Sequence, residues 1–131
     1  MSLPEFTAAR SCLTLSALVN ILGPMTADWS KSHVLNPRWP PHAKFHNGQT
    51  MSTGLCLGLL ALYYTWRSTP MPGDSLKTAA IMNTVYWVTA LSGILYPGAL
   101  AVDPEFGEGF PQFWPFLGLA GLPWLGYFLA R

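Results

Sequence analysis

Charged residues are scarce in this sequence. Asp, Glu, Lys and Arg make up 10% of its 131 residues, whereas about 25% is usual for a soluble globular domain. So few charged groups cannot solvate the surface of a soluble domain of this size. The seven Lys and Arg residues nearly balance the six acids, giving a formal net charge of +1 and no basic face for nucleic acid. The composition therefore favours a lipid environment and excludes nucleic acid as a partner.

The sequence also lacks a cysteine framework and the usual metal motifs. Its two cysteines, Cys12 and Cys56, lie in apolar segments, where we expect small buried hydrophobic residues and no disulfide. No HExxH sequence is present, and three histidines are too few for the histidine-rich di-iron membrane oxygenases. These absences favour chemistry that needs no metal or other cofactor.

Four apolar segments are present instead, and each has the length to cross a bilayer. They cover approximately residues 7–27, 46–66, 78–102 and 111–130, and a spanning helix needs roughly 17–25 residues. The second segment is apolar only from Thr50, so its helix must begin earlier, near His42 or His46. The last two segments lack the charged face typical of a soluble bundle. The sequence predicts an all-α fold, a single-domain integral membrane four-helix bundle with a long structured first loop.

The first apolar segment fits a retained membrane span better than a cleaved signal peptide. It has a single basic residue, Arg10, and Pro24, Asp28 and Trp29 stand where a small-residue cleavage site is expected. We expect the segment to be retained in a multi-pass membrane protein, with the endoplasmic reticulum as its compartment. The Lys and Arg residues favour cytosolic termini by one charge.

Opposite charges fall in two loops that this topology places at the same end of the bundle. The first loop carries only bases and the third only acids, namely Lys31, Arg38 and Lys44 against Asp103, Glu105 and Glu108. Ion pairs in water contribute little to stability, but we expect them to hold the first loop down as a lid.

Glycines and prolines indicate how the helices pack. Gly54 and Gly58 form a small-xxx-small pattern, which allows helices to approach closely within the chain or in a homodimer. Pro97, Pro115 and Pro123 fall inside apolar segments, where proline kinks a helix and opens space beside it.

Most residues suited to chemistry lie between Asp28 and Thr50. His42 and His46 are four residues apart, so they share one face if the helix begins at Pro41. One interpretation is acid/base catalysis by these histidines with Asp28, and with Asp103 or Glu105 as a second carboxylate. A second is a metal site formed by His33, His42 and His46. A third is that the histidines only fix the loop at the membrane interface.

Other polar and aromatic residues are candidates for substrate binding. Asn36, Arg38 and Trp39 lie in the first loop, which Pro37, Pro40 and Pro41 hold extended. Arg38 either pairs with an acid of the third loop or stabilises charge on a substrate oxygen. Asn20 and Asn83 lie within apolar segments and should face the bundle interior. Tyr86, Trp87 and Trp114 either line space between the helices as part of a substrate site or lie in aromatic belts at the membrane interface.

The first loop and the start of the second helix together carry the motif NPxWPPHxxFH. It is formed by Asn36, Pro37, Trp39, Pro40, Pro41, His42, Phe45 and His46. The motif resembles that of a group of small four-span membrane proteins, mostly fungal and of unknown function. Members occur beside enzymes of secondary metabolism, so the resemblance implies a lipophilic natural product as substrate. A looser architectural likeness is to sterol-isomerase-like membrane proteins, which surround acids and a histidine with aromatic walls.

From the residues and this resemblance we expect an enzyme that acts on a lipophilic polyketide or terpenoid by cofactor-independent acid/base catalysis. Epoxide opening, by hydrolysis or cyclisation, is the leading reaction, and isomerisation is the next. One alternative is a histidine-metal-dependent membrane oxygenase. Another is a non-catalytic partner or scaffold of a larger membrane enzyme.

Overall fold

The computed structural model describes residues 4–131 and is entirely helical over that range. Its elements are α1 (Ala8–Asp28), α2 (Pro41–Trp66), α3 (Pro72–Ser92), the short 3-10 helix η1 (Gly93–Leu95) and α4 (Phe113–Leu129). No strand occurs among the described residues. The predicted all-α fold with four main helices is therefore confirmed.

Residues with special backbone properties define where the helices begin. The Thr7 hydroxyl accepts a hydrogen bond from the Arg10 amide at 3.3 Å and caps α1. Pro41 and Pro72 occupy the first turns of α2 and α3, where the missing N–H of proline costs nothing. Because α2 begins at Pro41, His42 and His46 lie in its first turns, as the short apolar run required.

Two of the expected proline kinks are absent. The third helix ends at Ser92 and continues only as η1, so Pro97 lies outside it. Pro115 lies in the first turn of α4, where no hydrogen bond is lost. Pro123 does lie inside α4, and Pro24 lies inside α1.

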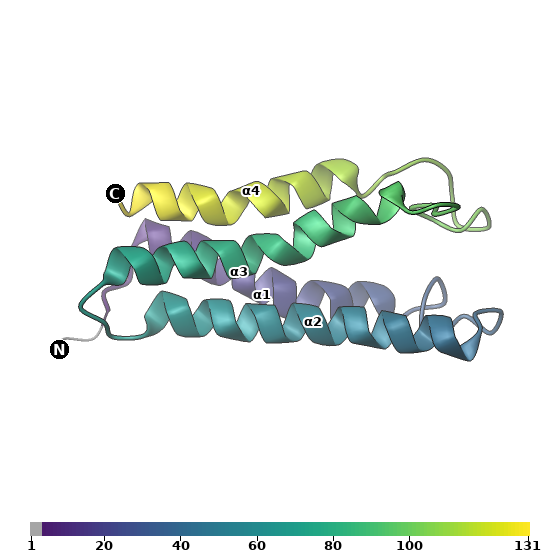
Figure 1. Ribbon diagram of the computed structural model, residues 1–131, viewed down its shortest axis with the longest axis horizontal. Coiled ribbons are helices and arrows are strands. Elements are labelled where there is room, and N and C mark those ends of the chain that lie inside the picture. Colours follow the sequence, from purple (N-terminus) through teal and green to yellow (C-terminus); the bar gives the residue numbers. More distant parts are fainter. Residues whose placement is uncertain (1–3) are drawn as a thin grey trace.

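The helices form an antiparallel bundle in which each packs against its neighbours in ring order (Figure 1). The start of α1, loop two (residues 67–71) and the end of α4 lie at one end, which we call the terminal end. Loop one (residues 29–40) and loop three (residues 96–112) lie together at the other, which we call the loop end (Figure 1). This is the arrangement that brings the bases of loop one to the acids of loop three.

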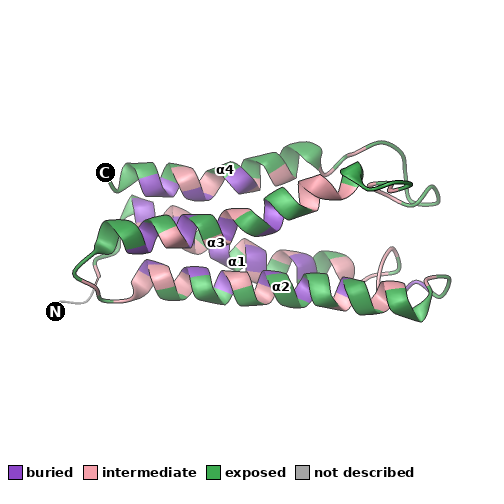
Figure 2. Cartoon of the chain, in the orientation of Figure 1, coloured by how far each residue is buried: buried purple, intermediate pink, exposed green. Residues whose placement is uncertain are grey.

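Small and polar side chains fill the bundle interior. Figure 2 shows the buried residues on the inward faces of the helices. Among the largest fully buried side chains, most are polar: Asn20, Asn83, Thr65, Ser16 and Ser75, beside Leu13 and Pro123. Alanines supply much of the remaining apolar core. Such residues permit close helix approach, and two apolar clusters, one around Leu13, Leu76 and Tyr127 and one around Tyr86 and Trp87, complete the core.

A pair of asparagines joins α1 to α3 at the centre of the bundle. The Asn20 side-chain amide donates to the Asn83 carbonyl oxygen at 3.1 Å, and the Asn83 side-chain amide donates to the Leu13 carbonyl oxygen at 3.1 Å. Both asparagines are fully buried. The prediction that these polar residues face the interior is confirmed, and Asn83 borders none of the cavities described below.

Gly54 and Gly58 form the contact between α1 and α2. A Cβ atom on Gly54 would lie 2.7 Å from the Asn20 carbonyl oxygen, and one on Gly58 would lie 2.7 Å from the Ala17 carbonyl oxygen. Both are shorter than a van der Waals contact, so only glycine permits this helix spacing. The small-residue pattern is thus used for packing within the chain.

Large apolar side chains cover the outside of the bundle. On α1, Leu15 and Leu22 are 54% and 57% exposed, and on α4 Phe128 is 62% exposed. The segment Pro72–Leu95, with a mean hydropathy of 1.3, is long and apolar enough to cross a membrane. It is the one segment of residues 4–131 that meets both criteria, and α4 is apolar but shorter.

The cysteines are both free thiols, as expected. Cys12 is half-buried, but Cys56 is exposed on α2. The prediction that both are buried is therefore wrong for Cys56, because its face of α2 points away from the other helices.

Candidate functional site

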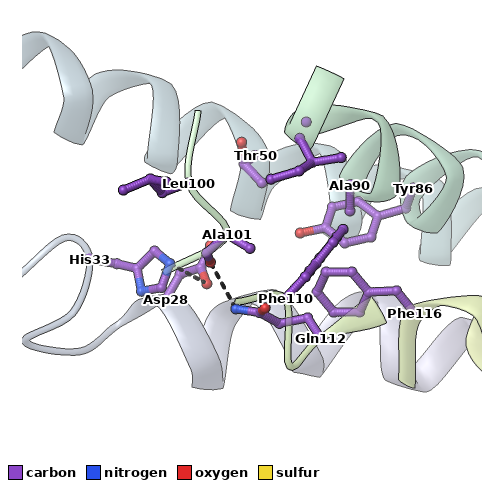
Figure 3. A pocket seen from close by; sticks show the side chains of 12 residues that line it. Asp28, His33, Thr50, Tyr86, Ala90, Leu100, Ala101, Phe110, Gln112 and Phe116 are labelled. Atoms are coloured by element: carbon purple, nitrogen blue, oxygen red, sulfur yellow. Dashed lines mark hydrogen bonds and ion pairs between the residues drawn. The ribbon is translucent and has the colours of Figure 1, made fainter. Parts of the chain in front are cut away.

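A cavity of about 280 Å³ lies at the loop end of the bundle. All four helices and both loops contribute to its wall, which is formed by Asp28, His33, Thr50, Tyr86, Ala90, Gly93, Ile94, Leu100, Ala101, Phe110, Gln112 and Phe116. In Figure 3, Asp28 and His33 form one side, and Tyr86, Phe110 and Phe116 form the other. A ligand in this cavity would meet one polar, ionisable wall and one aromatic wall.

Asp28 is the last residue of α1, and its carboxylate is held by groups from two other segments. The Asn47 side-chain amide of α2 donates to Asp28 Oδ2 at 2.8 Å. His33 Nε2 lies 3.7 Å from Asp28 Oδ1, within range of an ion pair when the imidazole is protonated. The Asp28 side chain is only 15% exposed. These contacts fix the carboxylate at the edge of the cavity.

Loop one brings His33 to Asp28 by folding back over the end of α1. The Val34 amide donates to the Asp28 carbonyl oxygen at 3.2 Å, and the His33 and Leu35 amides donate to the Ser30 carbonyl oxygen at 3.1 and 2.9 Å. These bonds close tight turns directly after the helix. They bring His33, which follows Asp28 by five residues, back to the Asp28 side chain.

A chain of polar groups leads from Asp28 into loop one. The second ring nitrogen of His33, Nδ1, lies 2.8 Å from Ser32 Oγ, and Ser32 Oγ lies 2.9 Å from Ser30 Oγ. The Trp39 ring packs edge-on against the imidazole at 5.4 Å between centroids. Both nitrogens of His33 thus face protein partners, with Asp28 on one side of the ring and Ser32 on the other.

The opposite wall adds a phenol and an amide to the aromatic rings. The Tyr86 hydroxyl points into the cavity (Figure 3). Gln112 donates from Nε2 to the Ala101 carbonyl oxygen at 2.9 Å, whereas its Oε1 is buried without a hydrogen-bond partner in the described part of the chain. A buried acceptor without a donor is costly. A ligand hydroxyl in this cavity would satisfy it.

Loops one and three are fastened together beside the cavity. Arg38 forms an ion pair with Glu105, the Asn36 side-chain amide donates to Glu105 at 3.3 Å, and the Trp39 indole N–H donates to Asp103 at 3.1 Å. We call these five residues the loop clasp. The expected pairing of Arg38 with an acid of loop three is confirmed. Lys31, Lys44 and Glu108 form no ion pair with any described residue.

The clasp also borders a second cavity of about 320 Å³. His33, Leu100, Ala101 and Gln112 line both cavities, so His33 stands between the two. Asp103 lines only the second, and Glu105 lines neither. The carboxylates expected to assist Asp28 are therefore engaged in holding the loops.

His42 and His46 lie outside this site. Both are exposed on α2, with their Nε2 atoms 3.0 Å apart, and His46 Nδ1 lies 3.2 Å from Gln49. Neither lines a cavity described here. The expected convergence with Asp28 does not occur, because the turns of loop one deliver His33 to Asp28 instead. The predicted metal site of His33, His42 and His46 is not formed. Among the described residues, no three His, Cys, Asp or Glu side chains lie close enough together to hold a metal ion.

The expected substrate-binding residues have mixed positions. Tyr86 lines the cavity. Trp87 is buried behind it and contacts Tyr86 and Phe116, with ring centroids 4.9 and 5.1 Å away. Trp114 is 74% exposed on the outer surface. Asn36 is buried in loop one, where its Oδ1 accepts from the Arg38 amide at 2.9 Å.

Sequence reasoning missed several residues of the wall. Gln112, Phe110 and Phe116 were not singled out, and His33 was considered only as a metal ligand. One signal was available for Gln112, which is a lone amide at the start of the most apolar segment. The pairing of His33 with Asp28 depends on the turns of loop one, for which the sequence gives no comparable signal.

Sequence comparison identifies the family. Residues 12–131 match a family of unknown function, DUF6640. The chain belongs to the DUF6640 family. The match includes every residue that lines the cavity at the loop end. No curated protein and no solved structure matches the chain, so the function of this DUF6640 protein has to be argued from its site.

Proposed function

We propose that this DUF6640 protein is an integral membrane protein whose four helices all cross the bilayer. The main support is the placement of side chains: many large apolar side chains are exposed on the outside of the bundle, whereas alanine and small polar residues fill much of its interior. In water, the exposed large apolar side chains, which occur on every helix, would cost free energy. In a bilayer, the same apolar outer surface contacts the hydrocarbon core at no such cost, and polar groups of the interior are hydrogen-bonded to one another.

Helix lengths agree with this placement. α1 and α3 have 21 residues each and α2 has 26, which correspond to about 32 and 39 Å of helix. α4 has 17 residues, near the lower limit for a hydrocarbon core of about 30 Å. Interior residues such as Asn20 lower the mean hydropathy of a helix without facing lipid. The outward face is therefore the better guide to the surroundings of α1. On α2 the exposed residues are mostly polar up to Thr53, and Leu59, Leu60 and Tyr63 form the exposed apolar part.

We further propose that the protein is an enzyme performing acid/base chemistry on a lipophilic small molecule in the loop-end cavity. One observation carries the proposal: the Asp28–His33 pair faces the Tyr86 hydroxyl across a cavity that also holds the unpartnered Gln112 Oε1. A carboxylate with an imidazole partner can accept a proton, and a phenol can donate one. A polyketide or terpenoid suits the aromatic wall and reaches the site from the membrane.

Epoxide opening is the reaction that this set of groups fits best. Asp28 accepts a proton from a water molecule as the water oxygen bonds to an epoxide carbon, and the ring C–O bond breaks. Tyr86 donates its proton to the departing oxygen, so the product is a diol. The proton on Asp28 leaves through His33 and Ser32, and Tyr86 regains one from solvent. A substrate hydroxyl in place of water would give a cyclic ether by the same transfers, and isomerisation would use the same base.

The remaining wall residues position the substrate. Gln112 Oε1 accepts a hydrogen bond from a substrate hydroxyl, and Phe110 and Phe116 contact its apolar body. The loop clasp keeps loops one and three closed over the cavity. Exclusion of bulk water strengthens each electrostatic contact inside.

A direct test uses purified protein in lipid nanodiscs, a panel of long-chain aliphatic and terpenoid epoxides, and isotope-labelled water. We expect diol products that carry one labelled oxygen. Asp28→Asn should lower kcat/KM by about 100-fold or more, as loss of a general base does. His42→Ala is the matched control at the same end of the bundle and should stay within about twofold. An active Asp28→Asn variant would overturn the assignment.

Ser32 supports a second candidate function, acyl transfer through a serine nucleophile. Its Oγ lies 2.8 Å from His33 Nδ1, the arrangement in which an imidazole takes the serine proton. Ser32 Oγ would bond to the acyl carbon, the proton would pass through His33 to the departing alcohol, and water would release the acid. A fluorophosphonate probe distinguishes the two functions. Labelling at Ser32 that is lost in His33→Ala favours acyl transfer, and no labelling favours the Asp28 mechanism.

A further inference from the structure

Two arginines border a cavity at the terminal end of the bundle, remote from the proposed catalytic site. This cavity has a volume of about 310 Å³ and lies between the start of α1, loop two and the start of α3. Arg10 and Arg67 line it together with Thr7 and Thr69. The one carboxylate in its wall belongs to Glu5, which is exposed. The charge at the cavity is therefore positive.

Each guanidinium is fixed in place by one hydrogen bond and by aromatic rings. Arg10 Nε donates to the Thr65 carbonyl oxygen at 3.0 Å, and the group lies 5.9 Å from the centre of the Trp66 ring. Arg67 Nε donates to the Ser75 hydroxyl at 2.7 Å, and the group lies 4.6 Å from the centre of the Tyr64 ring. Neither arginine would have to lose much side-chain entropy on binding a ligand.

The outer nitrogens of both groups remain available. Neither arginine forms an ion pair with a described residue, and their only side-chain hydrogen bonds within residues 4–131 use Nε. A guanidinium presents two parallel N–H groups that match two oxygens of a phosphate. Only one of the two guanidinium groups, that of Arg10, contacts a carbonyl oxygen at the end of α2, so capping of this helix does not account for both.

Backbone and neighbouring charges favour the same kind of ligand. α1 begins at Ala8 and α3 at Pro72, so two helix N-termini with their partial positive charge flank the cavity. Lys77 and Arg131 lie at the same end without lining the cavity. Tyr63, which is exposed, and Trp66 lie at this level, as aromatic residues do at a membrane interface.

We propose that Arg10 and Arg67 form a binding site for a phosphate group. The phosphate of an anionic phospholipid head group and free phosphate offer the same chemistry to these residues. The lipid source rests on the membrane placement proposed above, since a lipid head group lies beside loop two only if the helices span the bilayer. Free phosphate does not require that placement. The site does not depend on the enzymatic proposal, because it lies at the opposite end of the bundle.

The test measures binding to the full-length protein in detergent by native mass spectrometry. The probes are phosphatidic acid and phosphatidylglycerol, with phosphatidylcholine as the reference lipid, and inorganic phosphate is titrated separately by thermal shift. Arg10→Gln and Arg67→Gln should each weaken binding of the phosphate probe about tenfold. Lys77→Gln and Arg131→Gln remove the same charge from the same end and should change it by less than about twofold.

Each outcome has a defined meaning. Anionic lipid binding that depends on both arginines, with no effect of inorganic phosphate, supports a lipid head group. The same dependence for inorganic phosphate supports a soluble ligand. Equal weakening in all four variants would reveal nonspecific attraction and overturn the proposal, as would no weakening in any.

Arg67→Lys provides a second variant if Arg67→Gln does not fold. It keeps the charge but loses the paired N–H groups, so binding should still weaken several-fold. Wild-type binding by a folded Arg67→Lys protein would contradict the site as described. Epoxide turnover by Arg10→Gln should be unchanged, so failure at this cavity is distinguishable from failure at the loop end.

Discussion

At the scale of single residues, Asn83 has a structural role in place of the expected ligand contact. Its side chain links α3 to the Leu13 carbonyl oxygen and receives Asn20. We predict that Asn83→Ala lowers the free energy of unfolding by about 1–2 kcal/mol, because the buried Leu13 carbonyl oxygen loses a donor and the buried Asn20 amide keeps only the Asn83 backbone carbonyl as acceptor. Thermal unfolding in detergent measures the change, with the exposed Thr89→Ala as control. An unchanged stability together with a raised KM for the epoxide probe would contradict the structural role and indicate that Asn83 contacts the substrate.

The sequence predicted some residue positions because general physical rules determined them. An amide within an apolar segment must find a partner inside the bundle, and Asn20 and Asn83 do. Arg38 had no acid near it in sequence, but the topology brought Glu105 to it. The sequence could not identify His33 as the partner of Asp28 in the same way. Its position follows from turns of loop one, whereas the helical spacing of His42 and His46 was visible but led to an exposed face.

At the scale of elements, the spacing of α1 and α2 depends on two glycines. A Cβ at Gly54 would lie 2.9 Å from Pro24 Cγ, and one at Gly58 would lie 2.5 Å from Ile21 Cγ1. We predict that Gly54→Ala and Gly58→Ala each lower the free energy of unfolding by about 1–3 kcal/mol, because the helices must move apart.

Gly118→Ala in α4 is the matched control for these variants. A Cβ there meets nothing within 4 Å, so the change should be neutral or raise the stability by up to about 1 kcal/mol through better helix propensity. Chemical or thermal unfolding of the three variants side by side checks this. If Gly58→Ala resembles Gly118→Ala, close approach of α1 and α2 is not what stabilises the bundle.

Helix boundaries were less predictable than helix number. The apolar run that extends to about residue 102 suggested a longer third helix, but α3 ends at Ser92 and the chain leaves the bundle after η1. Loop three is apolar at Leu100 and Ala101 because these residues line the cavity. Hydropathy alone does not distinguish a residue in a helix from one in a loop that lines a cavity.

At the scale of the whole molecule, the account requires that the two ends of the bundle lie on opposite sides of a membrane. Single cysteines at Lys31, Pro104 and Pro70, introduced in a variant lacking Cys12 and Cys56, report the side by labelling with an impermeant maleimide in sealed microsomes. We predict that the first two positions label from the same side and the third only from the other. The protein should also resist extraction by alkaline carbonate. Labelling of all three from one side would show that the helices do not span.

The measurement that tests the central claim most directly is complementation of a deletion strain of the source organism, read as the profile of lipophilic metabolites. The claim is that the Asp28–His33 cavity is the functional site and that the His42–His46 pair is not. We predict that Asp28→Asn and His33→Ala fail to complement, so that the metabolite profile stays that of the deletion strain. His42→Ala and His46→Ala should restore the parental profile. Restoration by Asp28→Asn and His33→Ala, with failure of the His42 and His46 variants, would contradict the account.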